Sequence, residues 1–492
     1  MRYLYSVIIA AMAASSEVLA QSIILPAPVV HGNSFEILSN SRYSTHSGFT
    51  STLSTQVVSN VLWAMNRVPR LGGYREFYVA TPTNVYRYDS TAHALNVYLS
   101  GNHLYNAGAA YEVGIACDRY EEAGYAVQAG LLAGIAFWNA SESNVVCSPQ
   151  EFATEYANSN WNPVHQIKMI DVFGQAAATG LTTAVQAISS DSSLPRPRTT
   201  GSDTFEVLLS TLRLDSVFSP SGLTRDAISQ LLWAGYGVTP HTPAGNRGLT
   251  VPSAYGTYYL TRRIYFVRDT GVQRYNNRLP PGTGLTTGDH RLEHVTTGDR
   301  RPQLRAACPR IPSTAPDYIV VCVGDTAAYG PMVEAGLAGF QYLMQAASLR
   351  LTGFLTAPIT PAERSGIISA LGIPATDLPV VVFSCGEPLT GTGVIENQIR
   401  FVEIIGIKTA AQNSPPVRID YRLAGSARPK IVLFDLAGRP VRHFSYGILP
   451  AGANSTVWDG AGDNGDMVPA GVYFCRISAG GDVFSARFIL SR

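Results

Sequence analysis

Apolar and polar residues alternate in the same order in two distant stretches of the chain. Ser34–Leu38 (SFEIL) recurs as Thr204–Leu208 (TFEVL), and Ser59–Ala64 (SNVLWA) recurs as Ser229–Ala234 (SQLLWA), with every residue shifted by 170 positions. A fixed spacing over about 30 residues indicates an internal duplication. Two copies at this spacing predict a duplicated domain whose halves pack together like a two-fold dimer.

Within each copy the apolar spacing predicts helices and strands in mixed order. Residues 57–62 and 228–232 carry one apolar face at helical spacing, after the N-cap residues Ser54 and Thr224. Each copy then has a strand-like segment and a long helix rich in Ala and Leu. We expect the strands at residues 75–79 and 263–267, and the helices from Glu122 and from Glu334 through Leu351. This mixture predicts α+β units rather than a βαβ ladder.

Changes in composition divide the chain into three units. The first repeat is expected over residues 33–180 and the second over 203–390, joined by a Ser/Pro-rich linker at 189–198. A second boundary near residues 413–416 (NSPP) separates a small third unit, residues 417–492.

The N-terminus has the pattern of a signal peptide. Arg2 provides a basic start, residues 4–14 form an apolar run too short to span a bilayer, and small residues precede Gln21. We therefore expect residues 1–20 to be removed on export; the alternative is a buried N-terminal strand. No later run of about 20 apolar residues predicts a membrane span.

Composition narrows the class of protein further. The chain is 46% hydrophobic and 14% charged, which is typical of globular domains. The net charge is +1 with no basic stripe, which argues against nucleic acid as a partner. The six cysteines form no CxxC pair and no zinc-like cluster, so their pairing stays open. Cys322 and Cys475 lie in apolar runs and are expected to be buried thiols.

A series of short motifs runs through both halves in a fixed order. They are NVYRYD at Asn84–Asp89, HAL at His93–Leu95, PSA within Thr250–Tyr259, GVQRY at Gly271–Tyr275, DHRLE at Asp289–Glu293, YG at Tyr329–Gly330, EAG at Glu334–Gly336, LGIP at Leu371–Pro374 and GEP at Gly386–Pro388. Together they resemble the nitroreductase-like flavoproteins, in particular the SagB-type dehydrogenases. Leu337 stands where that family's EAG helix usually has His.

This resemblance implies two nitroreductase-like α+β units that form an intramolecular pseudo-dimer. Family members are dimers of identical chains with FMN in the interface. One subunit supplies an R-x-S-x-[RK] segment to the phosphate and ribityl chain, and here Arg42, Ser44 and His46 match it. The other subunit supplies the Pro-Ser segment beside the isoalloxazine, and here Pro252, Ser253, Ala254 and Tyr255 match it.

Each half has kept a different part of this site. At the 170-residue spacing the second half has Leu212, Leu214 and Ser216, with only Arg213 nearby, in place of the phosphate motif. The first half runs from residue 68 to residue 74 (VPRLGGY) without a Pro-Ser-Ala segment. The resemblance therefore implies one composite flavin site per chain.

The residue types suit this role. Arg42 and Ser44 can donate charge-assisted hydrogen bonds to a phosphate, and His46 helps when protonated. The small side chains of Ser253 and Ala254 allow a ring to approach the backbone, and Tyr255 can stack on it.

Each motif also has an ordinary interpretation. An Arg-x-Ser segment is often a surface loop, and Pro-Ser-Ala is often a turn. His93 and His290 are expected to be structural, and Trp63 and Trp233 to be helix core residues.

The third unit has all-β patterning. Residues 431–435 and 472–476 are short apolar strands separated by glycine-rich turns, which predicts a sandwich. The motifs LFDLAGRPVR, LPAG, WDG, DNG and PAGVY between Leu433 and Tyr473 resemble the FlgD-type Ig-like domain of exported bacterial proteins. The resemblance implies a sorting or surface-attachment module, often linked to type IX-like secretion.

The acidic turn residues of this unit admit two interpretations. Asp459, Asp463 and Asn464 are expected to bond their own turn backbone, with a calcium site as the alternative.

The sequence as a whole predicts an exported FMN-dependent oxidoreductase, secreted or at the cell surface, with the periplasm as a further location. Its partners would be a small-molecule or peptide redox substrate and, through the C-terminal domain, secretion machinery or the cell surface. Nitroaromatics, quinones, enones and azoline peptides stay open as substrates, as do the electron donor and the cleavage of the C-terminal domain after export.

The second hypothesis is a degenerate, flavin-free surface binding or structural module. No catalytic triad, carboxylate pair or metal cluster supports a hydrolase.

Overall fold

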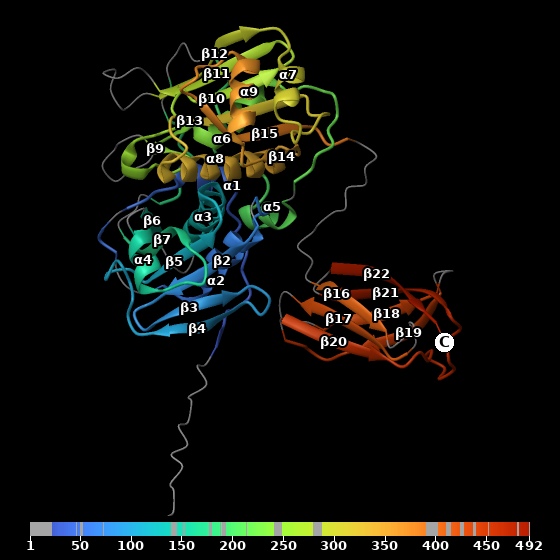
Figure 1. The fold of residues 1–492 in the computed structure, drawn as a ribbon. Coiled ribbons are helices and arrows are strands. Elements are labelled where there is room, and N and C mark those ends of the chain that lie inside the picture. The colour runs from blue at the N-terminus through green and yellow to red at the C-terminus, as the bar shows by residue number, and fades with distance from the viewer. Residues whose placement is uncertain are drawn as a thin grey trace, which may run out of the picture.

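The computed structural model describes residues 22–491, apart from residues 46, 50–52, 72, 139–144, 151–152, 177–179, 187, 189–192, 213, 241–247, 279–287, 390–401, 410–414, 424–427, 436–438, 451 and 480–481. The signal peptide expected at residues 1–20 lies outside the described residues. Figure 1 shows a first α+β half, a second α+β half and an all-β C-terminal domain.

The first half is built on one antiparallel sheet, with strands in the order β1-β4-β3-β2-β5-β7-β6. Its elements are β1 (Ile23–Ile24), α1 (Phe35–Ser41), α2 (Thr55–Arg67), β2 (Arg75–Ala80), β3 (Asn84–Asp89), β4 (Ala94–Ser100), β5 (Tyr111–Cys117), α3 (Tyr120–Ile135), β6 (Val145–Gln150), α4 (Ala153–Asn160) and β7 (Ile167–Gln175).

The second half repeats this topology. Its sheet has the order β12-β11-β10-β13-β15-β14, which corresponds strand for strand to β4-β3-β2-β5-β7-β6. Its elements are α5 (Phe205–Thr211), α6 (Arg225–Tyr236), β8 (Val238–Thr239), β9 (Gly248–Leu249), the 3-10 turn η1 (Ala254–Gly256), β10 (Ile264–Arg268), β11 (Gly271–Arg278), β12 (Gly288–Thr297), α7 (Arg301–Ala307), β13 (Asp317–Val323), α8 (Tyr329–Ser348), β14 (Thr352–Thr356), α9 (Pro361–Leu371) and β15 (Leu378–Gly386). The predicted duplication and the α+β class are therefore confirmed.

The repeated sequence motif forms the same local structure twice. Ser34 caps α1 by accepting a hydrogen bond from the backbone N–H of Ile37, and Thr204 caps α5 by accepting one from Val207. Such caps satisfy a donor that the helix itself leaves unpaired. Ser34 and Thr204 also pair with each other in a β-bridge, so the two copies meet at equivalent residues.

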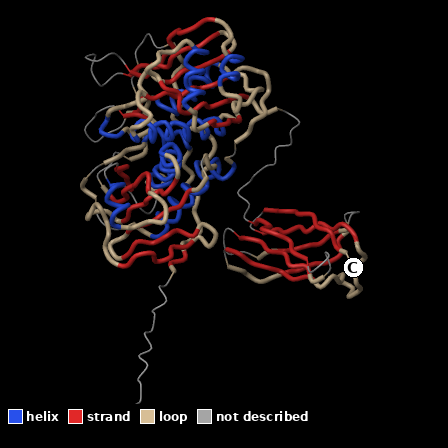
Figure 2. Tube along the Cα trace, viewed as in Figure 1, coloured by secondary structure: helices blue, strands red, loops and turns tan. Residues whose placement is uncertain are grey.

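Among the described elements, helices α3 and α8 make the most extensive contact, and they lie between the two sheets (Figure 2). They cross at two glycines. A Cβ on Gly124 would lie 2.1 Å from the carbonyl oxygen of Val333, and a Cβ on Gly336 would lie 2.1 Å from that of Glu121. Such distances are far below van der Waals contact, so only glycine allows the two backbones to approach this closely. The two contacts are equivalent, as two-fold pseudosymmetry requires.

Apolar residues of both halves belong to one continuous core. It includes Leu62, Met65 and Leu132 from the first half and Leu232 and Met344 from the second half. The two halves therefore pack as the intramolecular pseudo-dimer that the sequence predicted. Among the described helices, none combines the length and apolarity that a membrane span requires.

An extended arm precedes the first helix of each half and is held in the same way. The backbone N–H and carbonyl of Val29 both bond the amide side chain of Asn60. The backbone of Arg198 makes the same two bonds with Gln230. Residues 193–198 were expected to be part of a linker. They pack on the second half as the N-terminal arm packs on the first.

The long helices differ from their predicted bounds at both ends. Both α3 and α8 begin before Glu122 and Glu334, so these glutamates lie within the helices rather than at their starts. Leu351, predicted to be in the second helix, lies beyond its end. The chain turns at Arg350, whose φ of 61° is incompatible with continuing the helix.

The C-terminal domain is a sandwich of two antiparallel sheets, β16-β17-β20 and β19-β18-β21-β22. Apolar side chains of both sheets, among them Trp458, Tyr473 and Phe488, form a separate core. The strand β16 lies before the boundary expected at residue 417. The strands are β16 (Val402–Thr409), β17 (Val417–Leu423), β18 (Lys430–Phe434), β19 (Pro440–Ser445), β20 (Gly452–Trp458), β21 (Gly471–Ala479) and β22 (Asp482–Leu490).

We predict that Gly336→Ala destabilises the pseudo-dimer by about 1–3 kcal/mol, the usual cost of overpacking. Gly339→Ala, three residues further along α8, is the matched control, because its nearest neighbouring atom would lie at 3.6 Å. The control is expected to raise stability by up to about 1 kcal/mol, since alanine favours a helix over glycine. Urea unfolding measures both; equal effects would contradict the close helix crossing.

A buried carboxyl group at the interface makes stability depend on pH. Glu206 is 2% exposed and accepts a hydrogen bond from the backbone N–H of His31 in the other half. Burial raises the pKa of Glu206 from 4.5 to about 7. The folded state therefore holds this proton more tightly than the unfolded state. The resulting stabilisation is full below pH 4.5 and is lost as the pH rises through 7.

We predict that Glu206→Gln is more stable than the parent at pH 8, by at most about 3 kcal/mol. The two proteins should be nearly equal at pH 4.5, because the parent carboxyl group is then neutral in the folded state. Thermal melting at several pH values tests this, and a difference between the proteins that does not change with pH would contradict it.

Candidate functional site

Arg42 lies at the point where the first half meets the second. It is the C-cap residue of α1, and its backbone leaves the helix with φ −51° and ψ 127°. The side chain is only 3% exposed. Its Nη2 donates to the carbonyl oxygen of Leu249 in the second half at 2.9 Å, and its Nη1 donates to Ser44 Oγ at 2.7 Å. A buried guanidinium thus joins the end of α1 to strand β9.

The segment that follows β9 is held by both halves. The carbonyl oxygen of Thr250 accepts hydrogen bonds from Gln128 Nε2 on α3 (3.2 Å) and from Gln341 Nε2 on α8 (3.1 Å). Its backbone N–H donates to the carbonyl of Gly237 at 3.0 Å. Residues 249–253 therefore have a fixed position at the interface.

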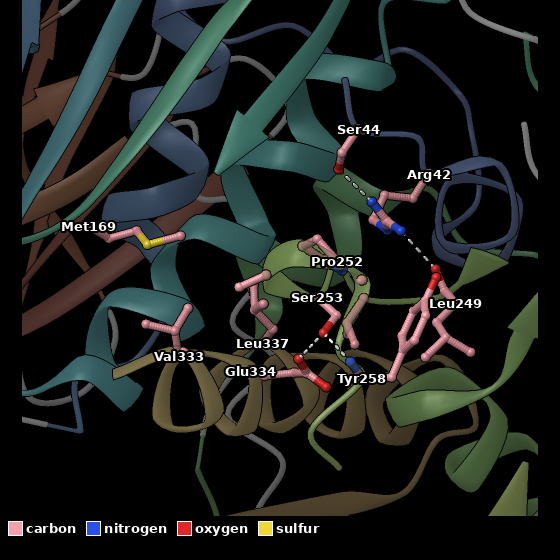
Figure 3. A pocket seen from close by; sticks show the side chains of 14 residues that line it. Arg42, Ser44, Met169, Leu249, Pro252, Ser253, Tyr258, Val333, Glu334 and Leu337 are labelled. Carbon is pink, nitrogen blue, oxygen red and sulfur yellow. Dashed lines mark hydrogen bonds between the residues drawn. The ribbon is translucent and has the colours of Figure 1, made fainter. Parts of the chain in front are cut away.

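A cavity lies between these parts, and we call it the composite pocket (Figure 3). The first half contributes Arg42, Ser44 and Met169 to its wall. The second half contributes residues within 249–258 and one face of α8 from Gly330 to Leu337. One end therefore carries a cation and a hydroxyl group, whereas Met169, Val333 and Leu337 are apolar.

Glu334 anchors the loop that forms one side of the composite pocket. Ser253 Oγ donates to its carboxylate at 2.5 Å, and the backbone N–H of Leu260 donates to it at 3.3 Å. The hydroxyl group of Tyr236 donates to it as well. Burial and the neighbouring carboxylate raise the pKa of Tyr236, so this hydroxyl group stays protonated and remains a donor.

The structure brings the two predicted half-sites together. Arg42 and Ser44 line the same cavity as Pro252, Ser253 and Ala254, although more than 200 residues separate them in the sequence. The Ser253 hydroxyl group is engaged within the protein, because it donates to Glu334 and accepts from the N–H of Tyr258 at 2.7 Å.

Three of the predicted residues lie wholly or partly outside the described part of the chain. His46 and Arg213 lie outside the described residues. The backbone of Tyr255 lies in η1, and its side chain is not described.

Sequence reasoning missed other residues of the composite pocket. Met169 and Tyr258 line it, and Leu249 anchors Arg42 through its carbonyl oxygen. Glu334 was noted only as part of the EAG motif and as a helix start. Its charge inside an otherwise apolar helix was the available signal for a buried polar role.

The equivalent position in the first half holds an ion pair. Glu122 corresponds to Glu334, and its carboxylate accepts from Arg75 Nη1 at 2.9 Å and from the N–H of Leu71 at 2.6 Å. The side chains of Arg75 and Glu122 are 1% and 0% exposed. A guanidinium thus takes the place that the Ser253 and Tyr236 hydroxyl groups have in the second half.

His93 and His290 are structural, as predicted. His93 lies between the hydroxyl groups of Tyr88 and Ser59, each at 2.7 Å, and the Ser59 hydroxyl donates to the carbonyl of Pro26 at 2.5 Å. The second half repeats this set with Tyr275 (2.8 Å), His290, Ser229 (2.7 Å) and Pro195 (2.6 Å from Ser229). Burial lowers the pKa of His93, and that of His290 to about 4, so both rings are neutral at pH 7. Each Ser–His pair therefore holds the extended arm of its half in place, through the serine hydroxyl group, and does not activate that serine as a nucleophile.

Other predicted core residues are also confirmed. Trp233 is 2% exposed, and Trp63 is partly buried against the same core. Cys322 and Cys475 are buried free thiols. Burial raises the pKa of Cys475 to about 12, which keeps this thiol unreactive.

The acidic turns of the C-terminal domain bond nearby groups. Asp459 accepts from the N–H of Ala461 at 3.0 Å, and Asn464 accepts from that of Asp466 at 3.2 Å. Asp463 instead bonds His443 at 2.6 Å. Within the described parts of the chain, no three His, Cys, Asp or Glu side chains gather in a way that suits a metal ion.

Comparison with known proteins identifies the C-terminal domain. Residues 407–482 match the family of FlgD Ig-like domains, which confirms the resemblance seen in the sequence. No curated protein matches the chain.

Several solved structures are similar to parts of this chain. A protein assigned as a nitroreductase from Anabaena variabilis is 13% identical, with a TM-score of 0.48, over 70% of this chain and 93% of that one. Another, from Ralstonia eutropha, is 20% identical, with a TM-score of 0.33, over 42% of this chain and 95% of that one. An FMN-dependent nitroreductase from Clostridium difficile is 13% identical, with a TM-score of 0.25, over 37% of this chain and 87% of that one. With identities of 13–20% and TM-scores below 0.5, these similarities extend to no residue of the site.

We predict that Glu122→Gln costs about 3–5 kcal/mol of folding stability, because it leaves the buried guanidinium of Arg75 without a counter-charge. Glu334→Gln is the matched variant at the equivalent position, and it should cost only about 1 kcal/mol, the usual contribution of one hydrogen bond. Chemical unfolding of both variants measures the difference, and a larger loss in Glu334→Gln would refute the asymmetry.

Proposed function

We propose that the chain binds one FMN in the composite pocket and acts as a flavin-dependent oxidoreductase of the nitroreductase type. The choice of FMN comes from the sequence resemblance. The observation that supports it is the cavity in which Arg42 and Ser44 of one half face the Pro252–Ala254 segment of the other. These residues belong to two sequence motifs that are about 200 positions apart.

The residues of the composite pocket fit this cofactor. A guanidinium and a hydroxyl group suit a phosphate, for which arginine is a strong and geometrically specific donor. The apolar side chains of Met169, Val333 and Leu337 suit a flat ring system, and the small Ala254 leaves room beside the backbone. The equivalent position in the first half holds the Arg75–Glu122 pair, which is the reason for proposing one site per chain.

Bound there, FMN would supply two-electron redox chemistry, and the protein would supply binding, orientation and exclusion of water. Arg42 and Ser44 would hold the phosphate end. Glu334 would act indirectly, by fixing Ser253 and hence the loop that borders the ring. The substrate would be a small molecule or a peptide.

We further propose that the protein is exported, after removal of residues 1–20, to the cell surface or the medium. The pattern of the N-terminus and the FlgD Ig-like domain at residues 407–482 support this. The C-terminal domain would then serve sorting or surface attachment, with secretion machinery or the cell surface as its partner.

A flavin-free surface module is the second candidate, and a specific observation favours it. Arg42 already bonds Leu249 and Ser44, and the Ser253 hydroxyl group already bonds Glu334. The interface is therefore well bonded without a ligand. Leu337 also occupies the position of the histidine usual in the family.

The two candidates are separated by titrating the mature protein and its Arg42→Ala variant with FMN. If FMN binds, loss of a charge-assisted contact should cost about 1.5–3 kcal/mol, which is roughly a 10- to 150-fold loss of affinity. Arg213→Ala is the matched control and should change little, because Leu212 and Leu214 cannot complete a phosphate site.

Since Arg42 also bonds Leu249, each variant is melted without ligand to separate lost binding from lost folding. Arg42→Lys, which keeps the charge but not the bidentate geometry, should retain part of the affinity. Equal losses in Arg42→Ala and Arg213→Ala, or a parent protein that binds no FMN, would overturn the proposal in favour of the surface module.

A further inference from the structure

A second cavity lies on the second half, between the extended arm at residues 193–198 and the first turn of α6, and we call it the arm pocket. Its volume is about 530 Å³, and its wall includes the apolar side chains of Leu223, Leu349 and Leu351. It shares no lining residue with the composite pocket. Leu337 borders one cavity and Leu349 the other, so the two lie roughly 18 Å apart along α8, at about 1.5 Å per residue.

The arm that borders this pocket is fixed through its backbone. The carbonyl of Pro195 accepts a hydrogen bond from the Ser229 hydroxyl group at 2.6 Å. The N–H and the carbonyl of Arg198 both bond the Gln230 side chain, at 2.8 and 2.9 Å. Arg196 lies between two prolines, which restrict its backbone further. The two arginine side chains therefore start from fixed positions at the edge of the arm pocket.

Four charged side chains line the arm pocket without bonding one another. Arg196 and Arg198 come from the arm, Asp226 from α6 and Glu387 from the segment after β15, and all four are exposed. Within the described part of the chain, none of these side chains takes part in a hydrogen bond or an ion pair. Two cations and two anions thus lie at one cavity, too far apart to neutralise each other by direct contact.

The arm of the first half lacks these charges. Val29 is the counterpart of Arg198, because each is held by an amide side chain at the same helix position. Ala27 is therefore the counterpart of Arg196. The paired arginines belong to the second half alone.

The space between arm and helix is also bridged in the first half. Gln56 Nε2 on α2 donates to the carbonyl of Ala27 on the arm at 2.8 Å. At the 170-residue spacing, Asp226 stands at the position of Gln56. An ionised carboxyl group has no proton to donate, so it cannot make this bond to the second arm. The change from glutamine to aspartate removes the bridge and adds a charge at the same point.

We propose that the arm pocket binds a short apolar peptide with free termini. The carboxylate of the peptide binds Arg196 and Arg198, since guanidinium groups form strong bonds with carboxylates. Its ammonium group binds Asp226 and Glu387. A dipeptide or tripeptide spans roughly 7–10 Å, so it can reach cations and anions that do not touch each other. Its apolar side chains pack against the leucines of the wall, which removes apolar surface from water.

The test titrates the mature protein, without flavin, with the dipeptide Leu-Leu in a calorimeter at neutral pH. The parent should bind Leu-Leu roughly two- to fivefold more tightly than N-acetyl-Leu-Leu or Leu-Leu amide, the usual range for one exposed ion pair. Each of these two ligands lacks one of the terminal charges. Gly-Gly keeps both charges but has no apolar side chain, and it should bind more weakly than Leu-Leu.

Variants assign each end of the peptide to its partner. Arg196→Ala combined with Arg198→Ala should weaken Leu-Leu binding roughly four- to 25-fold, if the two contributions add. The same variant should bind Leu-Leu amide as the parent does, because that ligand has no carboxylate. Asp226→Gln restores the amide found in the first half, and it should weaken Leu-Leu but leave N-acetyl-Leu-Leu unchanged.

Arg350→Ala is the matched control. Arg350 is also exposed, but it bonds Asp203 and does not line the arm pocket. This variant should keep the Leu-Leu affinity of the parent. All variants should melt close to the parent without ligand, because exposed side chains of this kind contribute little to stability.

Each other outcome overturns the proposal. A parent that binds no Leu-Leu at millimolar concentration removes the site. Leu-Leu affinity that is unaffected by the double arginine variant, or reduced equally by Arg350→Ala, removes the role of the arm. Equal affinity of the parent for Leu-Leu and Gly-Gly removes the apolar class of ligand. None of these results bears on FMN, because the proposed flavin site lies in the other cavity.

Discussion

The close crossing of α3 and α8 is the constraint on which the rest of the molecule depends. Two glycines, Gly124 and Gly336, allow each helix backbone to contact the other, and the two contacts are equivalent. Glu122 lies on α3 and Glu334 lies on α8. The separation of these two helices therefore sets the distance between the two halves. It thereby fixes the distance between Arg42 on one side and the Pro252–Ala254 segment on the other.

The two halves show how one buried carboxylate can lead to different outcomes. Both halves place a glutamate within the helix that crosses the interface, and burial of a charge demands compensation in each. In the first half the guanidinium of Arg75 supplies it. In the second half, hydroxyl and backbone N–H groups supply it. These donors come from the end of α6 and from the segment that follows β9, and the composite pocket lies beside Ser253 and Glu334.

The features that were predicted correctly from the sequence are those that a short segment encodes by itself. The duplication and the first helices of each half are encoded within a few residues, and the structure shows them where they were expected. The two half-site motifs line one cavity, and their role in binding a flavin stays a prediction. His93 and His290 were correctly expected to be structural, since each ring lies between two hydroxyl groups. The arm at residues 193–198 was predicted to be a linker, because a Ser/Pro-rich composition is typical of exposed segments. The composition does not reveal that Gln230 binds the backbone of Arg198.

The loop at Tyr258 lay beyond the reach of the sequence for a different reason. Its conformation depends on a hydrogen bond between Ser253 and Glu334, two residues 81 positions apart. The ion pair of Arg75 with Glu122 likewise joins different elements. Neither pairing has a local signature, because each follows from how the elements pack rather than from the preferences of one segment.

The covalent link between the halves also has a consequence for dilute solution. A pocket shared between two separate chains falls apart when the protein concentration drops below their dissociation constant. Here both contributors are on one polypeptide, so each meets the other at an effective concentration that dilution does not change. The pocket between Arg42 and residues 249–258 therefore persists in a single molecule far from any other copy.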